Sequence, residues 1–255
     1  MITDIVSTSA RCAGVIAAEY LAADSIPGYE AIDLTPYGFK NRDVILGDEL
    51  GFTGVAVGLL AEDLLTEEIW ELYRGTRVIA DGPNEWKVDA QFRLESCPFA
   101  PGCRTHYGFT STESTFRLLS GNTFPTLQAI SGHSLAAAWA LLRAARLRAS
   151  LISFAGPKVG DREFADFATQ AIPLLVRWVD HPDIVPKVPL EVWPLFEYMH
   201  AGPSNDFDAT DKINPGLSLG DRISAYHNIY TYWSAIDPKA SILPQYAAAP
   251  ASGSA

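Results

Sequence analysis

Hydrophobic and polar positions along the chain alternate between strand-like and helix-like segments. Short apolar or alternating runs predict strands over 67–74, 126–131, 151–154 and 174–179, and a glycine-containing hairpin over 43–60. Longer runs predict helices over 8–24, 112–120, 135–149, 161–171 and 222–236, with a long loop region over 187–220. Because strands alternate with helices, we expect an α/β fold with a largely parallel sheet and helices on both faces.

The length of the chain fits one domain of this class. It has 255 residues, of which 48% are hydrophobic and 19% charged, as in ordinary globular enzymes with a large core. We expect residues 1–244 to form one catalytic domain. Residues 245–255 are rich in Ala, Pro, Ser and Gly, which predicts a disordered tail.

The most informative motif is Gly132-His133-Ser134-Leu135-Ala136, which lies between the strand at 126–131 and the helix at 135–149. Strand, Gly-x-Ser-x-small and helix together are typical of a nucleophile elbow, in which a strained turn exposes the serine hydroxyl. The alternative is a simple turn in which Ser134 caps the helix.

Five further motifs occur in an order and spacing that resemble the class 3, fungal-type lipases of the α/β-hydrolase superfamily. They are Tyr73-Arg74-Gly75-Thr76, His106-Tyr107-Gly108-Phe109, 154–161 (Phe-Ala-Gly-Pro-Lys-Val-Gly-Asp), Asp183-Ile184-Val185-Pro186 and Tyr226-His227-Asn228-Ile229-Tyr230. The resemblance covers about residues 50–236 and implies the α/β-hydrolase fold and a serine carboxylester hydrolase.

A serine hydroxyl needs a base to take its proton, and the base needs an orienting carboxylate. Of the five histidines, the resemblance implies His227 as the base. It also implies Asp183 as the acid, with Asp180 as the competing carboxylate. The oxyanion would be stabilised by the N–H of Leu135 and by Thr76. No metal or other cofactor is required.

Two apolar segments are candidates for substrate binding. Residues 77–89 occupy the position of the family's lid and contain Trp86, and residues 188–199 follow the acid and contain Trp193 and Phe196. An apolar, aromatic segment beside the acid suits an acyl pocket. Ordinary core packing is the alternative for each of these side chains.

The chain has three cysteines. The resemblance implies a small disulfide loop between Cys97 and Cys103, just before the His-Tyr-Gly-Phe motif. Two unpaired loop thiols in a reducing compartment are the alternative. Cys12 lies in an Ala-rich helical stretch and is expected to be a buried free thiol.

The formal net charge is −11 and the isoelectric point is near 4.8. An acidic surface argues against nucleic acid as a partner and against capture by anionic membranes. No apolar run is long enough for a transmembrane helix, and residues 1–20 do not resemble a signal peptide. The resemblance suggests a secreted protein, whereas the missing leader suggests a cytoplasmic one.

These observations predict a lipase or broad esterase that acts on an ester or lipid substrate, either in solution or at a lipid–water interface. A feruloyl-type aryl esterase and a phospholipase A1 are alternatives within the class. A catalytically inactive lipid-binding homologue is the alternative outside it. The joint presence of Ser134, Asp183, His227 and Thr76 argues against that last possibility.

Overall fold

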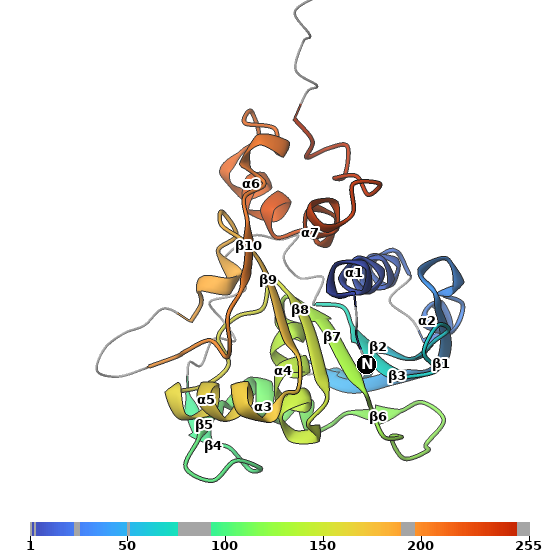
Figure 1. Cartoon of the computed structure of the whole chain (residues 1–255), viewed down its shortest axis with the longest axis vertical. Coiled ribbons are helices and arrows are strands. Elements are labelled where there is room, and N and C mark those ends of the chain that lie inside the picture. The colour runs from blue at the N-terminus through green and yellow to red at the C-terminus, as the bar shows by residue number, and fades with distance from the viewer. Residues whose placement is uncertain are drawn as a thin grey trace, which may run out of the picture.

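The computed structural model of the chain describes residues 2, 4–22, 26–49, 52–75, 93–189 and 197–248. These residues form an eight-stranded sheet and a separate two-stranded one, with helices on both sides of the larger sheet (Figure 1).

Across the large sheet the strands follow the order β10 (Asn205–Phe207), β9 (Leu175–Asp180), β8 (Ser150–Phe154), β7 (Ala129–His133), β3 (Ile69–Tyr73), β2 (Phe52–Asp63), β1 (Phe39–Glu49) and β6 (Arg117–Leu118). Neighbours from β10 to β3 are parallel, and those from β3 to β6 are antiparallel. The short strands β4 (Leu94–Ser96) and β5 (Arg104–His106) pair with each other. The carboxyl ends of the parallel strands therefore lie at one edge of the sheet, where α/β folds carry their sites.

Helices cover both faces of the sheet, as predicted (Figure 1). On one face, α4 (Leu135–Leu147) lies against β7 and β8, with α3 (Tyr107–Glu113) and α5 (Arg162–Ala171) beside it. On the other, α1 (Ile5–Leu21) and α7 (Ile229–Ile236) pack together over β3, β7, β8 and β9. The remaining helices are α2 (Ile26–Glu30) and α6 (Leu219–Tyr226). The predicted α/β-hydrolase architecture is confirmed.

Two hydrophobic cores follow from this layering. One lies between the sheet and α4 and includes Trp139, and the other lies between the sheet and α1 and includes Trp70. Strands β7 and β8 are buried on both faces, which explains why their sequences are nearly continuous apolar runs rather than alternating ones.

The predicted terminal helix over 222–236 is wrong, because the chain forms two helices, α6 and α7, separated by His227 and Asn228. Asn228 begins α7 as its N-cap, with its side chain accepting a hydrogen bond from the N–H of Tyr230 (3.0 Å). Such a cap offers the backbone an alternative to helix continuation.

The predicted helix over 112–120 is displaced toward the N-terminus. Helix α3 begins at Tyr107 and ends at Glu113, and the hydroxyls of Ser114 and Thr115 donate to carbonyls of its last turn, both at 2.7 Å. The chain then forms β6 at the edge of the sheet.

The disordered tail predicted over 245–255 includes residues that pair with the rest of the chain. Ala247 forms a β-bridge with Ile213, and the N–H of Ala248 donates to the Lys212 carbonyl at 2.8 Å. These backbone bonds hold residues 245–248 against the segment that precedes α6.

Candidate active site

Ser134 lies in the turn that joins β7 to α4, with a backbone conformation of φ 61° and ψ −133°. An L-residue rarely adopts this conformation, and the strain is typical of a nucleophile elbow. A Cβ at Gly132 would lie 2.7 Å from the Ala136 carbonyl oxygen, so only glycine fits where strand and helix cross. The capping alternative is wrong, because the Ser134 side chain makes no capping hydrogen bond.

Ser134 is joined to two other buried side chains by hydrogen bonds. The Nε2 atom of His227 lies 2.7 Å from the Ser134 Oγ. The Nδ1 atom of the same ring lies 2.8 Å from Asp183 Oδ2. With Nδ1 protonated toward the carboxylate, Nε2 is left free to accept the serine proton. The structure thus brings Ser134, His227 and Asp183 into one chain of hydrogen bonds from three separate loops.

Asp183 is held by groups besides His227. The Tyr232 hydroxyl donates to Asp183 Oδ2 at 2.7 Å, and the N–H of Val185 donates to Oδ1 at 2.9 Å. Burial, with the charge of Asp183, raises the pKa of Tyr232 well above its usual range, so this hydroxyl is a donor at neutral pH. The carboxylate is therefore fixed in orientation by both of its oxygens.

The competing carboxylate, Asp180, lies at the end of β9 and is also buried. Its Oδ1 accepts from the N–H of Ala209 at 3.0 Å, whereas its Oδ2 has no hydrogen-bond partner within the described ranges of the chain. Burial, with Asp183 and Asp208 nearby, raises the pKa of Asp180 to about 7. The carboxyl that contacts the imidazole is that of Asp183.

On the oxyanion side, Leu135 is the first residue of α4, and the N–H groups of a first helical turn have no partner within the helix. The N–H of Leu135 is therefore available as a donor.

Gly75, just after the end of β3, passes close to Ser134: a Cβ at Gly75 would lie 2.7 Å from Ser134 Cβ and 2.6 Å from the Tyr20 hydroxyl. Thr76, the other expected donor, lies outside the described residues. The Arg74 guanidinium bonds the Gly75 carbonyl (2.8 Å) and the Tyr29 hydroxyl, which is a structural role.

Three of the other histidines make contacts that differ from those of a general base. His106 caps α3, stacks on Phe109 with ring centroids 4.1 Å apart, and has its pKa lowered to about 4 by burial. His200 contacts the Pro186 carbonyl at 2.7 Å, and burial lowers its pKa to about 4 as well. His133 is buried beside His227.

The substrate-binding candidates Trp86, Trp193 and Phe196 lie outside the described residues, as does the whole segment 77–89. Their assignment to a lid and an acyl pocket stays a prediction.

The disulfide that the resemblance implies is not formed, since Cys97 and Cys103 are free thiols, as is Cys12. Backbone hydrogen bonds close the same loop: the N–H of Cys97 donates to the Cys103 carbonyl at 2.9 Å, and that of Cys103 to Ala100 at 3.1 Å. The loop therefore keeps its shape without a covalent link. Burial raises the pKa of both loop thiols, which makes them less reactive than exposed cysteines.

A buried ionic network beneath α4 is not among the features predicted from the sequence. Arg143 of α4 contacts both carboxylate oxygens of Glu71 in β3 at 2.5 Å, and Glu113 of α3 at 3.3 Å. Glu113 also pairs with Arg146 at 2.5 Å. A glutamate in the middle of an apolar strand and an arginine within an Ala-rich helix were the available signals.

Within the described part of the chain, no group of His, Cys, Asp and Glu side chains is arranged to hold a metal ion. None of the helices described there has both the length and the apolar character that a membrane span requires.

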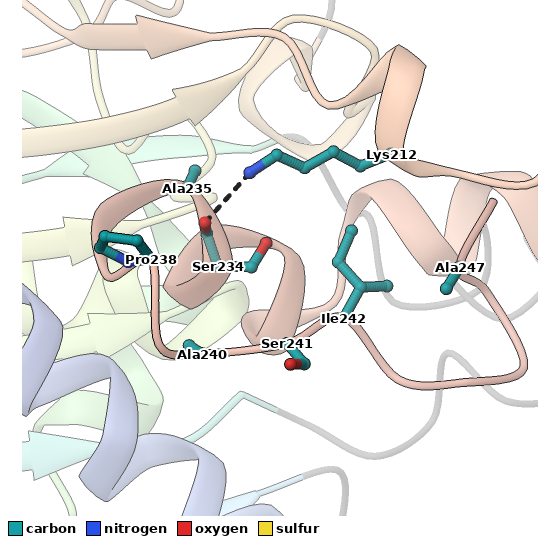
Figure 2. A pocket seen from close by; sticks show the side chains of 8 residues that line it. All are labelled: Lys212, Ser234, Ala235, Pro238, Ala240, Ser241, Ile242 and Ala247. Atoms are coloured by element: carbon teal, nitrogen blue, oxygen red, sulfur yellow. Dashed lines mark hydrogen bonds between the residues drawn. The ribbon is translucent and has the colours of Figure 1, made fainter. Parts of the chain in front are cut away.

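A cavity of about 590 Å³ lies between α7 and the C-terminal segment (Figure 2). Lys212 reaches into it and donates to the Ser234 carbonyl at 3.0 Å. None of its lining residues belongs to the set formed by Ser134, His227 and Asp183, so it is not the substrate pocket of this site.

Comparison with known proteins gives a family-model match over part of the chain and a similarity of fold. Residues 72–193 match the family model described as "Lipase (class 3)". A curated relative, secreted mono- and diacylglycerol lipase 1 of Fusarium solani, is 29% identical over 178 residues, which is 64% of this chain and 51% of the relative. The chain thus spans about half the length of that relative.

Solved structures with the same fold include two fungal lipases. Lipase II from Rhizopus niveus has a TM-score of 0.60 and 22% identity, with 79% of this chain and 78% of that chain covered. The mono- and diacylglycerol lipase from Aspergillus oryzae has a TM-score of 0.59 and 21% identity, with 84% and 83% covered.

Proposed function

We propose that this chain, which is similar to the class 3, fungal-type lipases, is a serine carboxylester hydrolase that cleaves acylglycerols or related carboxylic esters through an acyl-enzyme intermediate. The observation that carries this proposal is the continuous hydrogen-bonded chain from the Ser134 Oγ through His227 to Asp183. No cofactor enters the reaction.

In this mechanism the Ser134 Oγ attacks the ester carbonyl while His227 Nε2 takes its proton. Asp183 holds the Nδ1–H and stabilises the imidazolium that forms. The tetrahedral oxyanion receives hydrogen bonds from the N–H of Leu135 and from Thr76. His227 then returns the proton to the leaving alcohol. In the second half of the reaction, water attacks the acyl carbonyl while His227 takes its proton, and His227 passes that proton to the Ser134 Oγ as the carboxylic acid leaves.

For the substrate class we propose mono- and diacylglycerols, because the Fusarium solani relative and the Aspergillus oryzae structure are both named for them. Triacylglycerols, feruloyl-type aryl esters and phospholipids are the competing substrates. An inactive lipid-binding role is disfavoured, since a chain freed from catalytic selection has no need of a strained serine aligned with a buried histidine and carboxylate.

The Fusarium solani relative is named as secreted. We extend secretion to this protein, so that native enzyme is expected in the culture medium of its source organism. Recovery of the native protein only from washed cells would contradict this.

The test of function is a comparison of wild type and Ser134→Ala. Initial rates are measured on p-nitrophenyl esters of increasing chain length, on emulsified mono-, di- and triacylglycerol, and on methyl ferulate and phosphatidylcholine. We expect hydrolysis by the wild type, with partial acylglycerols preferred. The variant should lose at least about three orders of magnitude in kcat while keeping its circular dichroism spectrum.

Two results would overturn the proposal in different ways. Hydrolysis by Ser134→Ala near the wild-type rate would remove Ser134 from the mechanism. A folded wild type with no activity on any ester and no labelling of Ser134 by a p-nitrophenyl phosphonate would favour the inactive lipid-binding role.

A further inference from the structure

His227, the general base of the proposed reaction, lies at the break between helices α6 and α7 rather than inside a helix. His227 follows the last residue of α6, and α7 begins two residues later. In a continuous helix, the His227 carbonyl would accept from the N–H of Thr231. Here that N–H donates to the Asn228 carbonyl instead, at 2.9 Å. The break therefore leaves the His227 carbonyl without its helical donor.

The missing donor is supplied by His133, the residue immediately before the nucleophile. Its Nε2 lies 2.9 Å from the His227 carbonyl oxygen. Since a carbonyl only accepts, Nε2 must carry the proton. The two imidazole rings are tilted against each other, with centroids 4.9 Å apart and planes inclined by 34°. The His133 ring thus contacts both the backbone carbonyl and the imidazole ring of His227.

The opposite nitrogen of His133 is engaged by the N-terminal helix. The Tyr20 hydroxyl, in the last turn of α1, lies 2.8 Å from His133 Nδ1. Because Nε2 is the protonated nitrogen, Nδ1 is the acceptor and Tyr20 the donor. Burial, and secondarily the charge of His227, lowers the pKa of His133 well below its usual range, so the ring is neutral and has a single mobile proton. The Tyr20 bond therefore selects the tautomer that donates to His227.

We propose that Tyr20 and His133 are positioning residues for the general base: the Tyr20 hydroxyl locks His133 in the Nε2–H tautomer, and His133 in turn fixes the His227 backbone carbonyl exposed at the break between α6 and α7. This inference rests on the proposed function for its effect on rate, but its structural core concerns only these side chains.

Holding His227 in a fixed position would favour the proposed reaction. His227 must present Nδ1 to Asp183 and Nε2 to Ser134 at the same time, and a residue at a break between helices has a freer backbone than one within a helix. Small errors in the placement of a base cost large factors in rate. A neutral neighbour also fixes His227 without opposing the positive charge that its ring acquires, which a protonated histidine would do.

The primary experiment compares Tyr20→Phe with the wild type. The substitution removes one oxygen and keeps the ring that packs edge-on against His133. Tyr198→Phe is the control, because Tyr198 is a buried tyrosine whose hydroxyl has no hydrogen-bond partner among the residues that the structure describes. The measurements are kcat and KM on p-nitrophenyl butyrate, and the low-field proton NMR resonance of the His227 Nδ1–H, which does not depend on turnover.

For Tyr20→Phe we expect kcat to fall about tenfold with KM changed by less than about twofold, and the His227 Nδ1–H resonance to broaden through faster exchange with water. Tyr198→Phe should change neither quantity. His133→Gln, which keeps a side-chain N–H donor, should retain more kcat than His133→Leu, with folding of both checked by circular dichroism.

Unchanged kcat and an unchanged resonance in Tyr20→Phe would overturn the proposal. So would a rate loss with the resonance intact, because Tyr20 would then act through the substrate rather than through His227. If the wild type hydrolyses no ester but its resonance broadens on Tyr20→Phe, the proposed function fails while the positioning role stands.

Discussion

Asp180 and Asp183 lie three positions apart, and both are buried near the end of β9. Their hydrogen-bond contacts differ. Asp183 has donors on both carboxylate oxygens, including the His227 ring. Among the residues that the structure describes, Asp180 Oδ1 accepts from the N–H of Ala209 and its second oxygen has no hydrogen-bond partner. A buried carboxylate is stable as an ion only when its oxygens are satisfied.

We therefore predict that Asp183→Asn lowers kcat by about three to four orders of magnitude. An amide in this position would turn an N–H toward His227 Nδ1 and stabilise the wrong tautomer, as known for other serine triads. The measurement is kcat on a soluble ester, with Asp180→Asn as the control that keeps at least about a third of wild-type activity. A crippled Asp180→Asn beside an active Asp183→Asn would exchange the two assignments.

Asp180 also makes the stability of the protein depend on pH. Its pKa is raised from 3.8 to about 7 in the folded state, so the folded protein retains a proton that the unfolded chain has lost. Stability must then fall as pH rises from about 4 to about 7. The full displacement of about 3 pKa units corresponds to as much as about 4 kcal/mol.

Asp180→Asn should abolish this loss, because the amide cannot ionise and its oxygen can still accept from Ala209. In urea unfolding at pH 4 the variant should be close to the wild type, and at pH 8 it should be more stable. The same difference in unfolding free energy at both pH values would show that Asp180 is already ionised in the folded protein.

At the scale of secondary structure, the nucleophile helix is tied to its neighbours by charges as well as by apolar packing. Arg143 of α4 joins Glu71 of β3 to Glu113 of α3 in a buried network. The Tyr73 hydroxyl donates to Glu71 at 2.7 Å. These bonds fix the position of α4 relative to the strand that leads to Gly75, and so relate the elbow to the oxyanion side of the site.

Removing the Arg143 guanidinium should lower the stability of the fold, because Glu71 is then buried without a cation beside it. We predict that Arg143→Met lowers the free energy of unfolding by about 3–5 kcal/mol. Adding Glu71→Leu to that variant should restore part of the loss. Arg146→Met, at a side chain that is 35% exposed, should cost less than about 1 kcal/mol. Urea unfolding of the four proteins would measure this, and equal costs for Arg143 and Arg146 would contradict it.

At the scale of the whole molecule, 30 acidic residues against 19 basic ones make the surface strongly anionic. Long-range repulsion from an anionic lipid surface acts on the encounter with substrate and is screened by salt. Under the proposed function, the charge would therefore affect which interface the protein reaches, rather than the chemistry proposed at Ser134.

We predict slower hydrolysis of the same acylglycerol in emulsions that contain phosphatidylglycerol than in emulsions of phosphatidylcholine alone. The difference should be about threefold or more at 0.01 M salt, where the Debye length is about 30 Å, and should nearly vanish at about 0.5 M. Equal initial rates on both emulsions at low salt would mean that local contacts outweigh net charge.

The α/β class and most of its elements could be predicted from the sequence, because apolar periodicity records which backbone segments are buried. The runs before and after Ser134 became β7 and α4, and 161–171 became α5 within a residue. The separation of α6 from α7 at His227 could not be predicted in this way. The apolar helical pattern continues through that position, whereas the cap at Asn228 interrupts the helical hydrogen bonds. The edge strand β6 was missed since two residues carry no periodicity.

The resemblance to the class 3 lipases, the turn at Ser134 and the polar residues of the candidate site could all be predicted from the sequence, because short motifs constrain the local backbone. Which of those residues contact one another depends on the tertiary fold. Asp180 and Asp183 differ through contacts with Tyr232 and Ala209, which are distant in sequence. The link from Tyr20 through His133 to His227 spans most of the chain, and such contacts exist only once the sheet has brought its loops to one edge.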